Sequence, residues 1–423
     1  MAIIPGLILA PLPSRDASGA GDVIATRPGR APAAEMPGHA APVHWQIVTG
    51  EYPPQPGGVS DYSRLVAHAL ADAGDRVTVW APPCPEPDES YPGVAVRRLP
   101  DRFGRRSLRL LDRALDALPP PRRLLVQYVP HAFGWKGANV PFCFWLRSRR
   151  RDSMWIMFHE VAYPHGAAYS VAENVLSLVT RWMAAIAGRH AERIFISIPG
   201  WRPVLESAVG KAVPLEWLPI PSSVPAAGDG EGVAMVRSRT AQGRPLVGHL
   251  GTYGRLIRPM LRSALAQLMA ATDCRVLLLG RGGETFRDEL IEAHPALAGR
   301  VDASGELAAD DLSCHVSACD LMLQPYPDGV SSRRTSVMVA LSHGRPVVTT
   351  SGDLSEPLWF DGAVVLAPAD RPDQLAAAAV SLLASPARLG DLAARGAALY
   401  GERFDVRHTV AALRTVSAPA GRR

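Results

Sequence analysis

Lysine is nearly absent from this chain of 423 residues, occurring only at Lys136 and Lys211. The net charge of +5 therefore comes from arginine, a bias that we attribute to a GC-rich genome and not to function. The five cysteines form no CxxC pair and lack metal-ligand spacing, which predicts reduced core thiols and neither disulfides nor a metal site. Aromatic residues are scarce and no nucleic-acid-binding module is recognisable, so no binding to nucleic acid is expected.

The sequence also lacks a run that is long and apolar enough to span a bilayer. Met1 to Ala10 is apolar, but it has no positive leading segment and is interrupted by Pro5 and Pro11, so no secretory signal is expected. Residues 1–42 predict a disordered N-terminal tail, or upstream sequence included by a wrong start codon. We expect a cytoplasmic protein, peripheral at most on the inner face of the membrane.

From residue 44 onwards, short apolar runs alternate with longer amphipathic ones. The predicted strands are 45–49, 77–80, 94–98, 124–128, 154–158 and 193–197, and the clearest helices are 59–73, 106–118 and 168–187. Continuous apolar strands that alternate with helices are typical of a parallel sheet covered on both faces. Residues 43–218 are therefore predicted to form one α/β domain.

Residues 219–244 are rich in proline and glycine and predict a linker. A second α/β domain follows at 245–395, with strands at 246–250, 275–279, 321–324, 346–349 and 363–366. Its predicted helices are 257–271, 284–293, 308–318, 335–343 and 372–383. Residues 396–423 predict a C-terminal helix and tail, with the helical pattern at 394–413. Two such halves place an active site between them.

The most informative segment runs from Glu51 to Tyr62, between the first strand and the first helix. Gly57 and Gly58 are expected to adopt backbone angles closed to other residues, and Ser60 or Asp61 is suited to cap the helix. A helix start of this kind offers unpaired N–H groups to an anion such as a phosphate. The alternative is a proline-rich surface turn.

The residues Glu-Tyr-Pro-Pro and Pro-Gly-Gly-Val-Ser-Asp-Tyr in this segment resemble the first loop of family 4 glycosyltransferases. The resemblance implies the GT-B fold, in which two Rossmann-like, doubly wound domains face each other across a cleft. It also implies a nucleoside-diphosphate sugar on the C-terminal domain, an acceptor on the N-terminal domain, retention of configuration, and a last helix that packs back on the first domain. Gly57, Gly58 and Asp61 would belong to the acceptor and sugar loop.

The family's paired-glutamate motif is degraded here. Alignment on Gly344-x-Pro346 places Ser331 and Val339 where the family has its two donor-binding glutamates. Val339 is predicted to be an ordinary core residue. Ser331, Ser332 and the backbone at this helix start remain able to bind sugar hydroxyls or a phosphate, with Arg333 and Arg334 facing either the donor phosphate or solvent.

Three further stretches follow the family's layout in the C-terminal half. In the first, Gly251 precedes Thr252, which replaces an arginine, and Arg258, with Arg255 as a second candidate, replaces the lysine that binds the donor diphosphate. Gly280 and Gly282 resemble the nucleotide-contacting turn. Glu356 occupies a Gly-Gly-x-x-Glu-like turn, either as a donor contact or as a solvated glutamate at a helix start.

Two histidines at predicted strand ends lie in the N-terminal half. His159 resembles the family's active-site histidine and is the expected catalytic residue, the alternative being a structural histidine. His131 resembles an acceptor-side residue. No Asp-x-Asp-like ligand set is present, so we expect neither a metal nor another cofactor, and fixed positive groups would stabilise the leaving diphosphate.

Two arginine-rich stretches also lie in the N-terminal half, at 97–109 and 147–151. The first forms a basic amphipathic helix, which either rests on anionic lipid or a polyprenyl-phosphate acceptor or is a solvated basic face.

The resemblance therefore implies a hexosyltransferase-like enzyme of polysaccharide or glycolipid synthesis, acting on a glycan or a lipid-linked acceptor. The alternatives are a non-catalytic sugar- or partner-binding protein of the same fold, and a nucleotide-sugar epimerase or a phosphorylase.

Overall fold

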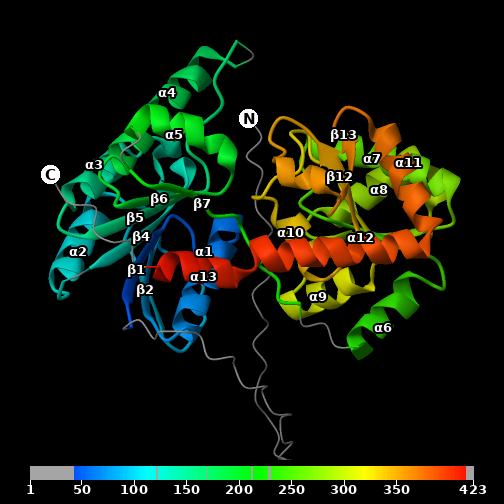
Figure 1. Cartoon of the computed structure of the whole chain (residues 1–423), viewed down its shortest axis with the longest axis horizontal. Coiled ribbons are helices and arrows are strands. Elements are labelled where there is room, and N and C mark those ends of the chain that lie inside the picture. Colours follow the sequence, from blue (N-terminus) through cyan, green and yellow to red (C-terminus); the bar gives the residue numbers. More distant parts are fainter. Residues whose placement is uncertain (1–41, 121, 168, 211–212, 227–229, 416–423) are drawn as a thin grey trace, which may run out of the picture.

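The computed structural model describes residues 42–120, 122–167, 169–210, 213–226 and 230–415. The predicted N-terminal tail thus lies, except for Pro42, outside the described residues, as does the end of the C-terminal tail. Two sheets dominate the chain, and Figure 1 shows them side by side with helices around each.

The N-terminal sheet has seven strands in the order β3-β2-β1-β4-β5-β6-β7, and all of its strand pairs are parallel. Its strands are β1 (His44–Thr49), β2 (Arg76–Ala81), β3 (Val94–Arg98), β4 (Arg123–Tyr128), β5 (Ser153–Phe158), β6 (Arg193–Ile196) and β7 (Leu215–Trp217). The central strands are buried almost throughout, because helices cover both faces of the sheet.

The helices of this domain divide between two apolar cores. On one face, α2 (Arg105–Asp116), α3 (Val140–Ser148), α4 (Val171–Gly188) and α5 (Arg202–Val209) cover the sheet. On the other face lie α1 (Gly58–Asp72) and α13 (Val406–Arg414). In α2, Leu111 and Leu115 are fully buried and face the core, whereas Leu110 is 39% exposed beside the arginines on the outer side.

The C-terminal sheet has six strands in the order β10-β9-β8-β11-β12-β13, again all parallel. Its strands are β8 (Leu246–Leu250), β9 (Arg275–Leu279), β10 (Val301–Gly305), β11 (Leu321–Gln324), β12 (Val347–Ser351) and β13 (Val365–Pro368). The surrounding helices are α6 (Gly230–Thr240), α7 (Ile257–Ala271), α8 (Gly283–Ala293), α9 (Ala309–Ala318), α10 (Thr335–Ser342), α11 (Pro372–Leu383) and α12 (Pro386–Leu399). The predicted pair of Rossmann-like parallel sheets is confirmed.

The structure corrects the sequence prediction in several elements. Residues 230–240 of the predicted linker form α6, and the predicted helix at 394–413 is divided into α12, a π-helical turn (Tyr400–Phe404) and α13. The short strands β7 and β10 and the helices α3 and α5 were not predicted. Of the five thiols, Cys84 is partly exposed and lies outside the described cores, and Cys314 is partly buried at the edge of one.

The chain returns to the N-terminal domain through α13, as the resemblance implies. The guanidinium of Arg193, on β6, donates to the carbonyls of Ala412 (3.0 Å) and Thr415 (3.1 Å) and pairs with Glu216. It also lies over the ring of Trp155, 4.5 Å from its centroid. Arg414 in turn donates to the carbonyl of Ala73 at 2.7 Å. The last helix is therefore bonded to both β6 and the end of α1.

Among the described residues, no single helix has both the length and the apolar character needed to cross a bilayer. The segments Pro372–Leu383 and Pro386–Arg414 pass such a test only when taken together, and they are bent by 109° at the break between them.

Replacing Arg193 tests how much the α13 contact contributes to stability. Arg193→Ala removes two hydrogen bonds to carbonyls and a buried guanidinium, so we expect the free energy of unfolding to fall by about 2 kcal/mol in a denaturant titration. Arg395→Ala is the control, because Arg395 forms an exposed pair with Asp391 and such pairs contribute about 0.5 kcal/mol or less. Equal losses in the two variants would show that the α13 contact does not stabilise the domain.

Candidate functional site

The loop between β1 and α1 is organised by Glu51. Its Oε1 atom accepts hydrogen bonds from the backbone N–H groups of Val59 (3.2 Å) and Ser60 (3.3 Å). Gly57 is extended and Gly58 opens the helix, so neither adopts backbone angles that are closed to other residues. Gly57 is required for a different reason, since a Cβ there would overlap the Glu51 carboxylate.

The predicted capping of α1 by Ser60 or Asp61 is also wrong. No side chain at the N-cap bonds to the helix, and the Glu51 carboxylate takes that role. Burial raises the pKa of Glu51. An anionic ligand at this helix start would therefore have to compete with a carboxyl group of the protein itself.

Asp61 lies in the first turn of α1 with only 6% of its surface exposed. Its Oδ2 atom has no hydrogen-bond partner among the described residues. Its pKa is raised from 3.8 to about 7, mainly by burial and partly by the neighbouring carboxylates of Glu51 and Glu306, against the opposing effect of Arg64. Asp61 is thus a carboxyl group that exchanges a proton near neutral pH.

His159 follows β5 directly and is buried. Its Nε2 atom lies 2.8 Å from Gln127 Oε1, and its ring packs edge-on against Tyr62 at 4.7 Å. Because the glutamine oxygen can only accept, Nε2 carries the proton and Nδ1 keeps its lone pair. Burial lowers the pKa of His159 to about 3. The imidazole is therefore neutral at physiological pH.

Glu160 connects predicted residues of the two domains, and the sequence did not single it out. Its Oε2 atom lies 3.7 Å from His131 Nδ1, and its Oε1 atom lies 3.7 Å from Arg333 Nη1. The Glu160 side chain is 41% exposed. His131 and Arg333 thus share one carboxylate at the boundary between the domains. Its position next to His159 at the same strand end was the signal available in the sequence.

The turn from β11 into α10 holds Ser331 and Ser332, and it bonds the domains together. The Ser332 hydroxyl donates to the Ser197 carbonyl at 2.8 Å and accepts from Trp217 Nε1 at 3.1 Å, so both contacts reach the N-terminal domain. Ser332 therefore has structural partners and is not a free hydroxyl. Ser331 is fully buried, and no described residue bonds to its hydroxyl.

Glu356 completes this turn and is not the solvated glutamate that the sequence left open. It is 6% exposed, and its carboxylate accepts from the Ser332 N–H at 3.0 and 3.1 Å. It also accepts from Trp359 Nε1 at 2.7 Å, and its Oε1 lies 2.5 Å from Ser332 Oγ, so Glu356 and the Ser197 carbonyl share the single hydroxyl proton of Ser332. The Glu356 carboxylate thus accepts the backbone N–H of Ser332, a group that was expected to bind the donor phosphate.

The two arginines of this turn differ in their surroundings. Arg334 is buried, pairs with Asp328 and lies over the ring of Tyr326 at 4.5 Å. Arg333 is 20% exposed and pairs with Asp328 at 3.3 Å as well as with Glu160. Val339 is fully buried in the core, as predicted.

The ends of β8 and β9 approach each other through glycine. Gly280 has φ +98°, and a Cβ there would overlap the carbonyl oxygen of Gly251. Gly282, with φ +88°, precedes α8, and Thr252 lies in the adjoining turn. His249, which the sequence analysis missed, is buried at the end of β8. Its Nδ1 lies 2.8 Å from the Leu323 carbonyl, its Nε2 has no partner among the described residues, and burial lowers its pKa to about 4.

Arg255 and Arg258 line a pocket of about 400 Å³ together with Tyr253, Pro259, Arg262 and Glu289. Arg258 already has protein partners, because its Nε donates to the Tyr253 carbonyl at 2.7 Å and its Nη1 bonds to Glu289. Three arginines against one glutamate leave the pocket positively charged at neutral pH. In the part of the chain that the structure covers, no group of three or more His, Cys, Asp or Glu is placed to hold a metal ion.

Comparison with known proteins identifies the class of fold. Residues 246–385 match the family described as "Glycosyl transferases group 1". Among solved structures, sucrose-phosphate synthase from Thermosynechococcus elongatus is 18% identical, with a TM-score of 0.67 over 88% of this chain and 97% of that chain. Anabaena HepE in complex with UDP and glucose is 17% identical, with a TM-score of 0.60 over 88% and 98% of the two chains.

WaaG, a glycosyltransferase involved in lipopolysaccharide biosynthesis, is 14% identical, with a TM-score of 0.60 over 88% of this chain and 100% of that one. No curated protein matches the sequence. The chain therefore has the fold of the GT-B glycosyltransferases, and its C-terminal domain matches a glycosyltransferase family. The resemblance to GT-B glycosyltransferases is therefore confirmed for the fold.

The raised pKa of Asp61 predicts a pH-dependent stability. As pH rises from about 4 to 7, the carboxyl of the unfolded chain loses its proton while folded Asp61 keeps its own, so the free energy of unfolding falls. Asp61→Asn cannot ionise and should be more stable than the parent at pH 8, by about 2 kcal/mol, with little difference at pH 4. Denaturant titrations at both pH values measure this, with the exposed Asp353→Asn as control. A difference between Asp61→Asn and the parent that is the same at both pH values would contradict the prediction.

Proposed function

We propose that the protein is a family 4-like, hexosyltransferase-like enzyme that transfers a sugar from a nucleoside-diphosphate sugar to a glycan or lipid-linked acceptor. The observation that carries this proposal is the meeting of the two domains at Glu160, between His131 and Arg333. Charged groups from both halves of a GT-B fold converge there, at the carboxyl ends of the parallel strands, where α/β proteins bind ligands. The fold and the family match of residues 246–385 add to this support.

In this proposal the donor lies on the C-terminal domain. Arg333 and the pocket of Arg255 and Arg258 provide positive charge for the diphosphate, and Gly251, Gly280 and Gly282 let the nucleotide approach the backbone. The leaving charge is stabilised by these arginines, without a metal or other cofactor, and the configuration at the anomeric carbon is retained. UDP is the first nucleotide to test, since HepE binds it.

The acceptor side comprises Asp61, His131 and His159. Neutral His159 offers a hydrogen bond and no charge, and Asp61 exchanges a proton near pH 7. We assign to Glu160 the role of the carboxylate that faces the reacting sugar. The family has a glutamate for this role at the position of Ser331, and serine has no carboxylate. The activity would serve polysaccharide or glycolipid synthesis on the cytoplasmic side of the membrane.

Arg258 and Glu289 provide a test of the donor site. If Arg258 binds the diphosphate, Arg258→Ala should weaken nucleotide binding about tenfold or more, because it removes a charged hydrogen bond. Glu289→Gln should strengthen binding, since it removes the carboxylate that competes for Arg258. Calorimetric titration with UDP, GDP, ADP and their sugars measures both effects.

Arg262→Ala is the matched control for this test, because Arg262 lines the same pocket and lies 3.7 Å from Glu289. Nucleotide affinity that is unchanged in both Arg258→Ala and Glu289→Gln would remove Arg258 from the donor site. Absence of binding by the parent protein to every nucleotide would overturn the donor assignment as a whole.

The second candidate is a non-catalytic binding protein of the same fold, which the replacement of both motif glutamates favours. Release of nucleoside diphosphate from the bound donor separates the two functions. In the enzyme, Glu160→Gln should lower this turnover about 100-fold, whereas nucleotide affinity should not fall, because the substitution removes a carboxylate that pairs with Arg333. Glu206→Gln, which changes a partly exposed carboxylate of α5, should leave both unchanged. Nucleotide binding without any turnover by the parent would establish the non-catalytic function.

A further inference from the structure

Helix α4 exposes an apolar stripe to the outside of the N-terminal domain. Val171, Val175, Leu178 and Trp182 follow each other at intervals of three or four residues and are 82, 54, 57 and 52% exposed. The opposite side of α4 is buried in the core through Met183, Ala184 and Ala187. The helix is therefore apolar on two sides, and the domain covers only one of them.

The stripe is widened by α3, which packs beside α4. Phe144 of α3 is 44% exposed, and its ring meets that of Trp182 edge-on at 5.8 Å. Beside this pair lies a surface pocket of about 430 Å³, lined by Phe144, Arg147, Trp182, Ile186, Arg189 and His190. An aromatic pair with a long apolar run on one surface is typical of proteins that rest in a membrane interface.

Positive charge surrounds one end of the stripe. Arg147, Arg189 and His190 line the same pocket, and burial and then the charges of Arg150, Arg147 and Arg189 lower the pKa of His190. Within the described ranges, no carboxylate lies at ion-pair distance from Arg147 or Arg150. These two arginines are therefore available to anionic groups outside the protein.

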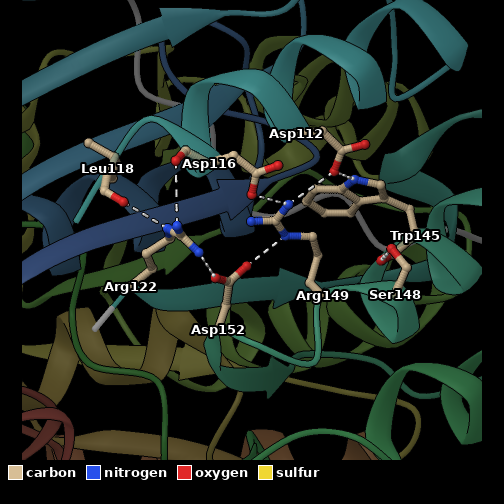
Figure 2. Close-up of polar contacts among 8 residues, drawn as sticks. All are labelled: Asp112, Asp116, Leu118, Arg122, Trp145, Ser148, Arg149 and Asp152. Atoms are coloured by element: carbon tan, nitrogen blue, oxygen red, sulfur yellow. Dashed lines mark hydrogen bonds and ion pairs between the residues drawn. The ribbon is translucent and has the colours of Figure 1, made fainter. Parts of the chain in front are cut away.

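The neighbouring Arg149, by contrast, forms ion pairs within the protein. Figure 2 shows its guanidinium between Asp152, at 2.6 Å, and the carboxylates of Asp112 and Asp116, at 3.3 and 2.9 Å. Arg122 approaches Asp152 from the other side, at 3.0 Å. This network fixes α2 and α3 against the ends of β4 and β5. Among the arginines of 147–151, Arg149 therefore stabilises the domain, and the others face outward.

We propose that this apolar-basic surface, formed by Phe144, the α4 stripe and Arg147, Arg150 and Arg189, docks on a membrane that contains anionic lipids. The apolar side chains would enter the interface, and the arginines would contact lipid phosphates. The contact through the 106–118 helix stays a prediction, and that helix offers less apolar surface than α4, because Leu111 and Leu115 are buried and Leu110 is 39% exposed. A second copy of this chain fits less well, because a two-fold contact would bring two arginine-rich rims together.

The place of α4 in the fold connects this surface to the candidate site. Helix α4 follows β5, so it begins at the same edge of the sheet as His159 and Glu160, and Figure 1 shows it along the outer margin of the domain. The Val171 end of the stripe therefore lies at the edge of the sheet that carries the acceptor-side residues, whereas Arg189 and His190 lie at the opposite edge, just before β6.

Vesicle sedimentation of the full chain tests the docking surface. We expect binding to phosphatidylcholine vesicles that contain phosphatidylglycerol, weak binding to phosphatidylcholine alone, and loss of binding at high salt. The double variant Leu178→Asp/Trp182→Asp should bind at least about tenfold less, and Arg147→Ala about fivefold less. Phe360→Asp is the matched control, because Phe360 is an equally exposed apolar residue on the C-terminal domain, at 62%.

Three results would overturn the proposal: no binding to either vesicle, equal binding by the parent and the double variant, or a dimer of the parent that the double variant breaks without any vesicle binding. Because the substituted side chains are exposed, the double variant should keep the melting temperature of the parent. Its nucleotide affinity should also be unchanged, so failure of vesicle binding and failure of donor binding are separate results.

Discussion

Two carboxylates of this chain satisfy backbone N–H groups at turns where a strand leads into a helix. Glu51 accepts from Val59 and Ser60 at the start of α1, and Glu356 accepts from Ser332 ahead of α10. Such groups must find acceptors when buried, and a ligand anion is one solution among several. Here the protein provides its own anions at both turns. A bound phosphate therefore depends on guanidinium groups, or on withdrawal of a carboxylate, and helix starts alone do not suffice to hold it.

The same carboxylates determine how the domains are held. Glu356 orients Ser332, whose hydroxyl bonds to Ser197 and Trp217 and whose carbonyl accepts from Ile220 at 3.0 Å. The Arg193 contacts with the end of α13 form a second connection, at the far end of the chain. Any opening between the domains has to pivot about the Ser332 turn or break its buried bonds. Glu160, by contrast, is partly exposed, and its two contacts at 3.7 Å are loose enough to be exchanged for a ligand.

The sequence predicted the parts of the structure that depend on local pattern. Continuous apolar strands defined both sheets, and the helix 257–271 was placed at its observed bounds. The roles of Glu51, Glu160 and Glu356 were not predictable, because each depends on residues that only the folded chain brings together. Helix α6 was missed because its proline- and glycine-rich surroundings obscured a short helical run. The break between α12 and α13 was missed because Ala and Leu continue on either side of it.

Amphipathic patterns in a sequence predict that a helix has an apolar side but not which surface will cover it. In α2 the core covers Leu111 and Leu115 and leaves Leu110 as the exposed leucine among the arginines. In α4 the apolar residues exceed what the core can cover, because Met183, Ala184 and Ala187 already fill the contact with the sheet. The remaining stripe adds nothing to the fold of the single chain, and an exposed run of this length favours aggregation unless a partner covers it. The arginines beside the stripe favour a partner with negative charge. A membrane that contains anionic lipids matches both the apolar stripe and the arginines.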